Sequence, residues 1–594
     1  MTLFGRPMTA RSAERRVGSR APDPSAAATL RLDGECSRAL EIGRNRLLVT
    51  GAMFVLAFSV IAARLVDVTL TSAGANGATR SAKAAVLGVE RADLVDRNGV
   101  LLATSLPTVS LYARPHEVVD RAAAARWIAA TLPDLSAAEV MARLSEPRQF
   151  VYLRRTLTPR QEYDINALGI PGLYFQKSEK RLYPQGELTA HAVGLTDLDN
   201  KGISGIEKSQ ERGLTGRREA LALSLDVRVQ TVMRTELLRS MDEFHAVGAT
   251  GLVMDVGTGE VLSLVSLPDY NPNDLAASSP DAMFNRATLG VYEMGSTFKL
   301  FNTAAALDSG SASVDSRYDA IHPIKVSRFE ITDFHPENRW LTVPEILIYS
   351  SNIGSARMAE AMGTDTQRAF LTRIGLTRPS AIELPEVGSP LVPNPWRDIN
   401  TLTIAYGHGM AVTPLHMMTA VAALVNGGFY HPATLLRRQD GEKVPQIRVV
   451  KPETSRTLCE LMRLVVTRGT GGKADVAGYE VGGKTGTAEK NSRGGYHHKS
   501  LLSSFIATFP VSNPKYVVLV MIDEPQGIKE SFGYATAGWT AAPAVGRVVA
   551  QIGPLLGMPP QNAPEEAAVP RERVAVNAAL HGGPDKELTF AEAQ

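Results

Sequence analysis

One uncharged apolar run separates the N-terminal segment from the rest of the chain. It covers residues 47–63, seventeen residues without a charge, which is close to the shortest helix of about 17 residues that crosses a bilayer. Nine arginines and five acidic residues precede it, and an excess of arginine stays on the cytoplasmic side. We therefore expect residues 1–46 to form a basic cytoplasmic segment, residues 47–70 to form a transmembrane anchor, and the remainder to be exported.

Two other interpretations of this run stay open. Residues 73–75 (Ala-Gly-Ala) resemble the small-residue site of a cleaved signal peptide, although they lie well beyond the apolar run and the leader is long for a signal. A buried core helix is the second interpretation, but the run lies far from other apolar stretches. We favour an uncleaved anchor.

Residues 71–220 show the mixed pattern of an α+β module. After a small polar linker, short apolar runs flank Asn98-Gly99, a pair that is typical of a tight turn between two strands. Apolar positions at helical spacing predict helices over 122–132 and 137–144. No candidate chemistry stands out in this module.

From residue 221 to residue 558 the pattern predicts a layered α/β domain. A helix is expected over 227–241 behind Asp226, and another begins at Thr413-Pro414. Four apolar strands lie near the two ends of the domain, at 250–255, 261–266, 503–509 and 516–522. Strands from distant segments with helices between them predict one sheet that helices cover on both faces. Residues 559–594 are rich in proline, alanine and glutamate, and we expect a disordered tail there.

Composition and charge narrow the function classes. A chain of 594 residues exceeds what one hydrophobic core usually serves. With 44% hydrophobic and 21% charged residues, it is neither wholly disordered nor polytopic in a membrane. Its 63 basic and 61 acidic residues give a net charge of +2, so nothing favours nucleic-acid binding. Cys36 and Cys459 would lie on opposite sides of the predicted membrane and cannot pair, and no Cys/His spacing indicates zinc.

A serine and a lysine one helical turn apart are the first candidates for catalysis. Ser296 is expected at the N-terminus of an apolar helix that stops at Gly310, and Lys299 follows on the same face. A serine hydroxyl needs a base to become a nucleophile. Burial and a second cation both lower the pKa of a lysine, which makes it a usable base. Alone, Ser-x-x-Lys is expected about once by chance in a chain of this size.

Two later motifs make the pattern specific. Ser350-Ser351-Asn352 and then Lys484-Thr485-Gly486-Thr487 follow within the same predicted domain. In this order, Ser-x-x-Lys, Ser-x-Asn and Lys-Thr-Gly resemble the signature set of the penicillin-binding proteins and serine β-lactamases. With that resemblance, Ser350 is expected to relay a proton between Lys299 and a leaving amine.

The remaining residues of the set are expected to bind the substrate. Asn352 offers an amide to a peptide-like substrate, and Lys484, on an edge strand, attracts a carboxylate and helps to keep the other lysine neutral. The hydroxyls of Thr485 and Thr487 bind that carboxylate. Gly486 lets the strand lie close against the ligand. The backbone N–H groups of Ser296 and Thr487 are expected to form an oxyanion hole.

A competing motif overlaps the last of these. Residues 478–485 also match the phosphate-loop pattern G-x4-G-K-T, which needs a buried strand before its first glycine and a helix directly after its threonine. The residues before Gly478 do not form a core strand pattern, and the glycines at 486, 494 and 495 disfavour a helix. We therefore expect no nucleotide or other cofactor. His497-His498, in a glycine-rich loop, is interpreted as solvated surface and not as a metal site.

Outside the catalytic set, the chain resembles a class B penicillin-binding protein over roughly residues 85–555. Further short motifs carry this resemblance: Arg91, Asp96–Gly99, Arg181-x-Tyr183-Pro184, His191, Gly205-x-Glu207, Leu214-x-Gly216, Tyr406-Gly407-x-Gly409, Val412–Leu415 and Ala541-Ala542-Pro543. The residues after the anchor do not resemble the glycosyltransferase domain of class A relatives. Ser350-Ser351-Asn352 followed by Ile353-Gly354-Ser355 resembles the division-specific (FtsI) type. Met294 is a departure, because the family often has proline there.

The resemblance implies a fold and an activity. The fold is the penicillin-binding transpeptidase fold, α/β/α with an antiparallel central sheet, carried on an α+β pedestal behind one transmembrane helix. The activity is that of a peptidoglycan D,D-transpeptidase, in which Ser296 attacks the D-Ala-D-Ala carbonyl of a stem peptide and passes the acyl group to an amine on a neighbouring stem. β-Lactams imitate the donor and acylate the same serine.

The resemblance also implies a location and partners. The catalytic domain is expected in the periplasm of a bacterium, anchored in the inner membrane, where it takes part in septal cell-wall synthesis. A SEDS glycosyltransferase of the FtsW type and other divisome proteins are the expected partners. Two alternatives stay open: a membrane-anchored D,D-carboxypeptidase or β-lactamase, in which water replaces the acceptor amine, and a division scaffold with a vestigial catalytic fold.

Overall fold

The computed structural model describes residues 49, 51–62, 91–326, 329–439, 441–492 and 495–561, with the backbone alone at 329, 491–492 and 495–499. The chain divides into two units, residues 1–86 and 87–594. In the first unit, residues 51–62 are helical. Among the described residues, no helix combines the length and the apolar character that crossing a membrane requires. The predicted cytoplasmic segment, much of the predicted anchor and nearly all of the predicted tail lie outside the described residues.

The second unit begins with the predicted α+β module. Its strands are β1 (Leu94–Val95), β2 (Leu101–Ala113), β3 (Val151–Leu157), β4 (Leu173–Leu182) and β5 (Leu221–Ala222). They form one sheet in the order β3-β2-β1-β5, with β4 also paired to β2. The predicted turn is confirmed, because β1 and β2 pair antiparallel around Asn98-Gly99. β5 pairs with β1 beyond the predicted module boundary, and the domain bounds 71–220 and 221–558 stay predictions.

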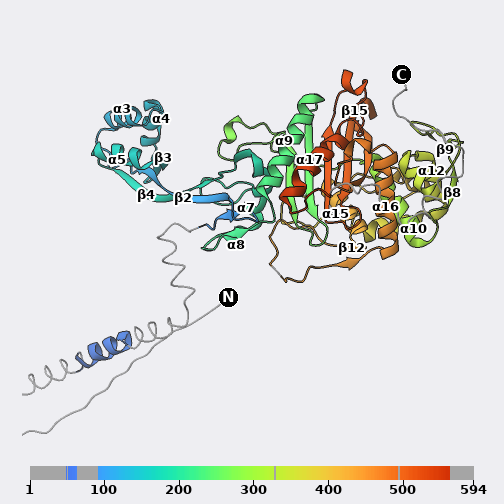
Figure 1. Ribbon diagram of the computed structural model, residues 1–594. Coiled ribbons are helices and arrows are strands. Elements are labelled where there is room, and N and C mark those ends of the chain that lie inside the picture. Colours follow the sequence, from blue (N-terminus) through green and yellow to red (C-terminus); the bar gives the residue numbers. More distant parts are fainter. Residues whose placement is uncertain are drawn as a thin grey trace, which may run out of the picture. The chain divides into compact units, whose positions relative to one another are not determined.

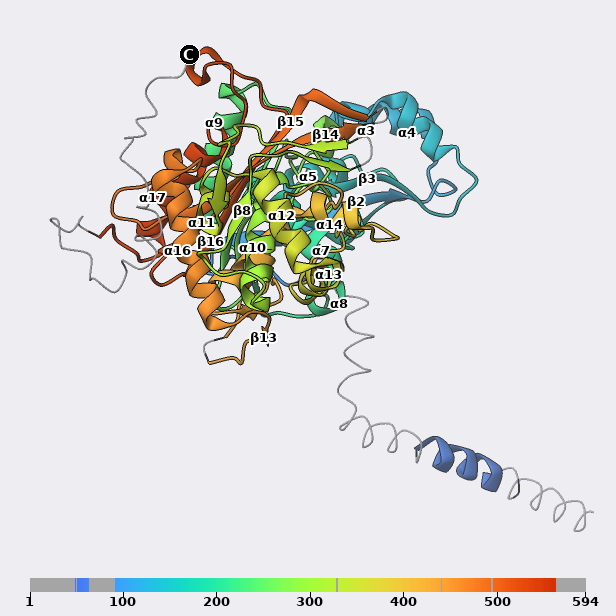
Figure 2. The same ribbon diagram turned by 90° about the vertical axis from the view of Figure 1, so that its right-hand side faces the viewer.

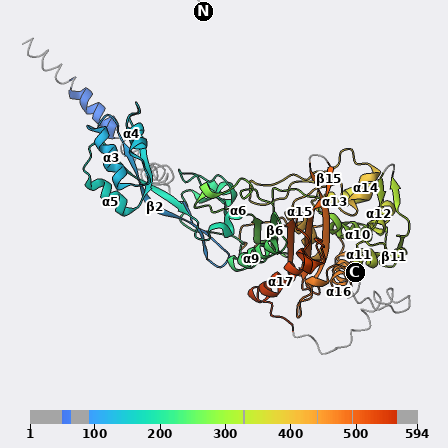
Figure 3. The same cartoon turned by 90° about the horizontal axis from the view of Figure 1, so that it is seen from above.

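Three helices pack on the far end of this sheet. They are α3 (Arg121–Thr131), α4 (Ala137–Leu144) and α5 (Pro159–Ala167), which gather at one end of β2 (Figure 3). Both predicted helices are therefore confirmed to within one residue. Asp120 caps α3 through the Ala123 N–H, and Ser136 caps α4. Short helices follow: η1 (Gly186–Thr189), α6 (Ala190–Val193), α7 (Gly205–Ser209) and α8 (Glu211–Leu214).

A buried ion cluster joins these pieces. Glu207 on α7 accepts hydrogen bonds from Arg91 Nε at 2.5 Å and from Arg181 Nε at 2.7 Å. Arg91 also donates to Glu211, and Arg181 donates to the Ala92 carbonyl oxygen at 2.8 Å. The side chains of Arg91, Arg181 and Glu207 are 0–2% exposed, whereas that of Glu211 is 32% exposed. Because each arginine is hydrogen-bonded to a carboxylate, the cluster ties β4 and α7 to the residues just before β1 without leaving a buried charge unpaired.

The predicted sheet of the larger domain is confirmed. Its strands are β6 (Gly248–Asp255), β7 (Val261–Leu267), β14 (Gly482–Ser492), β15 (Gly495–Phe509) and β16 (Tyr516–Asp523), in the order β14-β15-β16-β6-β7. All four pairings are antiparallel. β16 pairs directly with β6 although more than 250 residues separate them in the chain. The first and last parts of the domain therefore close one sheet, and β14 lies at its edge.

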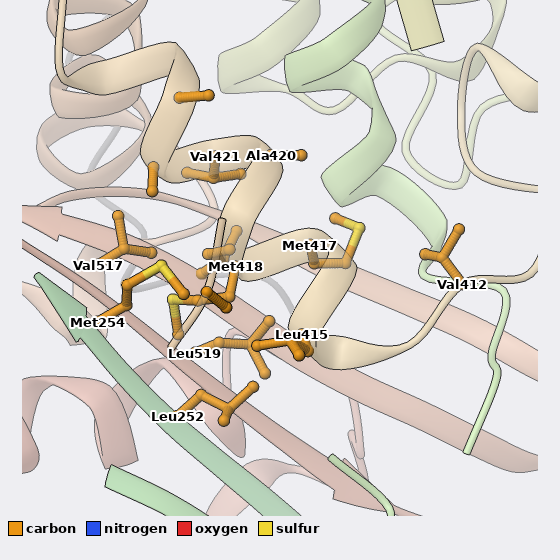
Figure 4. Close-up of a cluster of buried hydrophobic side chains, with 14 of the residues drawn as sticks. Leu252, Met254, Val412, Leu415, Met417, Met418, Ala420, Val421, Val517 and Leu519 are labelled. Atoms are coloured by element: carbon orange, nitrogen blue, oxygen red, sulfur yellow. The ribbon is translucent and has the colours of Figure 1, made fainter. Parts of the chain in front are cut away.

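Side chains alternate between the two faces of this sheet and build two cores. On β16, Val518 and Val520 belong to the core beneath α9 (Val227–Glu243) and α17 (Ala541–Leu555), which lie together beside the sheet (Figure 1). Val517 and Leu519 point to the opposite core. There they lie close to Leu252 and to residues of α15 (Pro414–Val425) (Figure 4). The period of two places apolar side chains on both faces, which confirms the α/β/α layering.

The inserted segment is mostly helical. It contains α10 (Phe298–Ser309), α11 (Val343–Ile348), α12 (Asn352–Met362), α13 (Thr364–Arg373), α14 (Asp398–Ile404) and α16 (Pro452–Arg468). It also contains three short 3-10 helices: η2 (Leu275–Ala277), η3 (Gly295–Thr297) and η4 (Gly472–Ala474). Its short strands are β8 (Arg317–Asp319), β9 (Ile324–Val326), β10 (Phe329–Ile331), β11 (Trp340–Thr342), β12 (Phe429–Tyr430) and β13 (Ile447–Arg448). Another 3-10 helix, η5 (Lys529–Ser531), follows β16. α10, α12 and α16 lie together in Figure 2. Thr413 caps α15 as predicted.

Candidate active site

The first motif lies where the chain turns into a buried helix. Residues Gly295–Thr297 form the 3-10 turn η3, which leads directly into α10, and Gly310 ends that helix in the left-handed conformation. The Thr297 hydroxyl donates to the Met294 carbonyl oxygen at 2.8 Å and closes the turn. Ser296 is half-buried at this helix tip, whereas Lys299 is fully buried one turn further on. The predicted placement of Ser296 at a helix N-terminus is confirmed.

Lys299 connects the first motif to the second. Its Nζ lies 2.6 Å from Ser296 Oγ, 2.7 Å from Asn352 Oδ1 and 3.4 Å from Ser350 Oγ. A neutral amine can accept one hydrogen bond while it donates two others. The geometry therefore suits a lysine that accepts the Ser296 proton and donates to the amide oxygen of Asn352.

The third motif reaches the same place from the sheet edge. Lys484 lies on β14 opposite Ile506, and its Nζ donates to Ser350 Oγ at 2.9 Å. Ser350 thus lies between the two lysines. The serines and amines of three motifs, distant in sequence, converge in one cluster.

Burial sets the charge of the two lysines. Burial, and after it the charge of Lys484, lower the pKa of Lys299 well below its ordinary value, and the negative charge of Asp333 opposes this shift. Burial lowers the pKa of Lys484 to about 7. Neither lysine forms an ion pair within 4 Å with the described acidic side chains. Such a pair of amines favours losing a proton, and Lys299 is the one next to the nucleophile.

Asp333 is a site residue that the sequence did not reveal. Its carboxylate accepts hydrogen bonds from Ser351 Oγ at 2.6 Å and from the N–H groups of Asn352 at 2.5 Å and Ile353 at 2.9 Å. It thereby holds the first turn of α12, where a negative charge is also favoured by the helix dipole. Ser350, just before this turn, has a φ of 59°, which is unusual for a residue other than glycine. A lone acid in a loop carries no spacing signal, so only contacts identify it.

The threonines of the third motif differ in exposure. Thr485 is buried, and its hydroxyl lies 2.7 Å from that of Thr470 and 3.3 Å from Lys484 Nζ. Thr487 is half-buried, and its hydroxyl accepts a hydrogen bond from the Ala537 N–H at 3.2 Å. Of the two predicted carboxylate binders, Thr487 is therefore the more exposed.

Gly486 and Gly295 permit close approach of two backbones. A Cβ on Gly486 would lie 2.6 Å from the Met294 carbonyl oxygen, and one on Gly295 would lie 2.5 Å from the Thr487 carbonyl oxygen. Any side chain at either position would force β14 away from the nucleophile turn. The prediction that Gly486 lets the strand lie close against a ligand stays a prediction; what the contacts show is that its missing side chain lets β14 lie close against the nucleophile turn. This approach also brings the backbones of Ser296 and Thr487 together.

The phosphate-loop alternative does not fit this arrangement. Lys484 and Thr485 lie within strand β14, and no helix begins at the threonine. Among the side chains that the structure describes, no three His, Cys, Asp or Glu residues are arranged to hold a metal ion. The side chains of His497 and His498 lie outside that description, and their interpretation as surface stays a prediction.

Two protein-family models match this chain, one in the larger domain and one in the pedestal. Residues 249–547 match the penicillin-binding protein transpeptidase domain, and residues 87–236 match the penicillin-binding protein dimerisation domain. The probable peptidoglycan D,D-transpeptidase FtsI of Caulobacter vibrioides is 41% identical over 79% of this chain and 82% of its own length. The peptidoglycan D,D-transpeptidase FtsI of Escherichia coli K12 is 31% identical over 80% and 85%.

A solved structure extends the likeness to the fold. Penicillin-binding protein 3 of Mycobacterium tuberculosis, complexed with ampicillin, superposes with a TM-score of 0.64 over 80% of this chain and 97% of its own, at 22% identity. At that identity the likeness concerns the fold alone. The two domain matches and the FtsI relatives carry the assignment: this chain belongs to the class B penicillin-binding proteins.

Proposed function

We propose that this protein is a peptidoglycan D,D-transpeptidase of the division type, with Ser296 as its nucleophile. The observation that carries the proposal is the position of Lys299 Nζ, 2.6 Å from Ser296 Oγ and joined through Ser350 to a second buried amine. The two FtsI relatives, whose names state this activity, support it. The protein is a serine-type enzyme that needs no cofactor for this chemistry.

Acylation begins at the helix tip. Lys299, neutral because it is buried, takes the proton of Ser296, and Oγ attacks the D-Ala-D-Ala carbonyl carbon of the donor stem. The negative charge on the carbonyl oxygen is stabilised by the backbone N–H groups of Ser296 and Thr487. Ser350, between the two lysines, relays a proton to the leaving D-alanine nitrogen, and the C–N bond breaks.

The other residues hold the donor. Asn352 donates its amide to the peptide backbone of the donor, while its Oδ1 stays with Lys299. Lys484 supplies positive charge for the terminal carboxylate, and the hydroxyls of Thr487 and Thr485 complete that site. β-Lactams acylate Ser296 through the same contacts. The acyl group then passes to an amine of a neighbouring stem, which forms the cross-link.

The proposal includes a location and partners. The uncharged run at 47–63, with its arginine-rich leader, anchors the protein in the bacterial inner membrane with the catalytic domain in the periplasm. The pedestal over residues 71–220 and the transpeptidase domain over residues 221–558 follow this anchor. A SEDS glycosyltransferase of the FtsW type and other divisome proteins are its partners in septal wall synthesis.

A fluorescent penicillin tests this proposal. The full-length chain in membranes should be labelled covalently, and Ser296→Ala should abolish labelling and fail to support division. Ser145→Ala, at an exposed pedestal position, is the matched control and should label like the wild type. Rapid release of the label would indicate a β-lactamase, a hydrolysed stem without cross-links would indicate a carboxypeptidase, and division supported by Ser296→Ala would indicate a scaffold.

A further inference from the structure

A threonine outside the three motifs lies against the buried threonine of the third, and the chemistry above does not use it. Thr470 Oγ1 lies 2.7 Å from Thr485 Oγ1. Thr470 is exposed on a turn, whereas Thr485 lies on β14 and is 6% exposed. The pair therefore connects a surface turn to a residue that the proposed function assigns to the donor carboxylate.

The turn that carries Thr470 packs closely on its neighbours. A Cβ on Gly469 would lie 2.7 Å from the carbonyl oxygen of Ile348, the last residue of α11. A Cβ on Gly471 would lie 3.1 Å from the ring of Phe505, on the strand that pairs with β14. Because only glycine permits such approaches, the turn is fixed between the helix before the second motif and the sheet. Packing therefore sets the position of the Thr470 backbone.

The hydroxyl of Thr485 has a second neighbour in Lys484. The charged amine donates to Thr485 Oγ1 at 3.3 Å, to the Thr485 carbonyl oxygen at 3.2 Å and to Ser350 Oγ at 2.9 Å. These three bonds use all three protons of an ammonium group. A hydroxyl oxygen has two lone pairs and one proton. Thr485 Oγ1 thus accepts one bond from Lys484 and keeps one lone pair and its proton.

The remaining bond, between the two threonines, decides where that proton goes. Each hydroxyl has one proton, so either threonine can donate to the other. When Thr470 donates, both lone pairs of Thr485 Oγ1 are used, and the proton of Thr485 is left for another acceptor. A carboxylate can only accept hydrogen bonds, so a bound donor substrate favours this arrangement. A hydroxyl that accepts two bonds is also a stronger donor.

We propose that Thr470 is a positioning residue for the donor carboxylate, because it fixes the hydroxyl of Thr485 with its proton toward that carboxylate. This inference rests on the proposed function and concerns how the same site recognises its substrate. Thr470 acts through Thr485 and does not touch the carboxylate itself. Without the Thr470 hydroxyl, the Thr485 side chain is freer to turn about χ1, and a buried oxygen loses a partner.

Two donors that differ in one charge test this role. An N-acyl-D-alanyl thioglycolate ends in a carboxylate, and its methyl ester does not. Their kcat/KM values with the full-length enzyme report acylation. Thr470→Val replaces the hydroxyl by a methyl group, and we expect it to lower kcat/KM for the charged donor about fivefold while kcat/KM for the ester stays within twofold of the wild type. Thr470→Ser keeps the hydroxyl and should restore the wild-type value.

A double variant separates positioning from direct contact. In a Thr485→Val background, Thr470→Val should cause no further loss, because the hydroxyl on which it acts is absent. Thr467→Val, at an exposed threonine on α16, is the matched control and should act like the wild type.

Three results would overturn the inference. They are a further fivefold loss in the double variant, which would mean direct contact with the carboxylate, an equal loss with the ester, and an unchanged or raised kcat/KM for the charged donor in Thr470→Val. Failure of a penicillin to acylate Ser296 in the wild type would instead overturn the proposed function.

Discussion

Two regions of the molecule bury positive charge, and they do so with opposite consequences. In the pedestal, Arg91 and Arg181 are fully buried against the carboxylate of Glu207. In the transpeptidase domain, Lys299 and Lys484 are equally buried, but their nearest partners are hydroxyl and amide oxygens. The two clusters share burial and sign of charge and differ in the presence of a counter-charge.

The difference decides whether a buried cation is structural or reactive. Burial disfavours the charge of Arg91, but the carboxylates of Glu207 and Glu211 outweigh this effect and raise the pKa of the guanidinium. Burial lowers the pKa of Lys299, and Lys484 lowers it further. A paired cation keeps its charge and connects elements, whereas an unpaired one gives up its proton and becomes a base.

The largest expected effect comes from removing the base. Lys299→Met should slow penicillin acylation by on the order of 10³-fold or more, because the general base of Ser296 is lost. The stability of the fold should change little, by about 1 kcal/mol or less, since no charge loses a partner. Acylation rates and thermal unfolding of the full-length protein measure the two effects. A large loss of stability would mean that Lys299 is charged and paired like Arg91.

The converse experiment removes the counter-charge of the pedestal. Glu207→Gln leaves Arg91 and Arg181 buried without a carboxylate between them, and should destabilise the protein by about 3–5 kcal/mol. Urea unfolding measures this change. Glu219→Gln, in an exposed ion pair, is the control, because surface pairs contribute about 0–1 kcal/mol. If Glu207→Gln is as stable as the wild type, the buried arginines do not depend on this carboxylate for stability.

The pH dependence of the acylation rate distinguishes the roles of the two lysines. The acylation rate should rise with pH as Lys299 loses its proton, and fall as the pH passes about 7, where Lys484 loses the charge that attracts the donor carboxylate. Lys484→Arg should abolish the fall, because a guanidinium keeps its proton throughout this range. If the alkaline limb persists in Lys484→Arg, Lys484 is not its source.

The smallest expected effect concerns Asp333. Its charge raises the pKa of Lys299, so Asp333→Asn should move the acid limb of the acylation profile to lower pH. The maximal rate should fall about tenfold, since a weakened hydrogen-bond acceptor costs on the order of 1.4 kcal/mol in holding the first turn of α12. Asp315→Asn, at an exposed position, should leave the profile unchanged. A shift toward higher pH would contradict this role of Asp333.

Much of the fold follows from local patterns. The Asn98-Gly99 turn, the capped helix α4 and the helix that begins at Pro414 were predictable because neighbouring residues determine turns and caps. The strand pair of β6 and β16 was predictable in outline, since apolar runs at both ends of a domain need a common sheet. The register of the pair was not predictable, because contacts between the two strands determine it.

The residues of the candidate site were likewise predictable only in part. Ser296, Lys299 and the later motifs were found from residue type, spacing and order along the chain. Asp333 and the burial of Thr485 carry no such signal. Gly486 was singled out for a ligand contact, and its close approach to the nucleophile turn became visible only in the folded structure.

By itself, the sequence determined which chemical groups this protein possesses and where its helices and turns begin, because both depend on residues that are near one another in the chain. The tertiary structure alone decided the protonation of those groups. A lysine is a base or a counter-ion according to what surrounds its amine after folding. For Lys299, those surroundings come from β14 and α12, each far from it in the sequence.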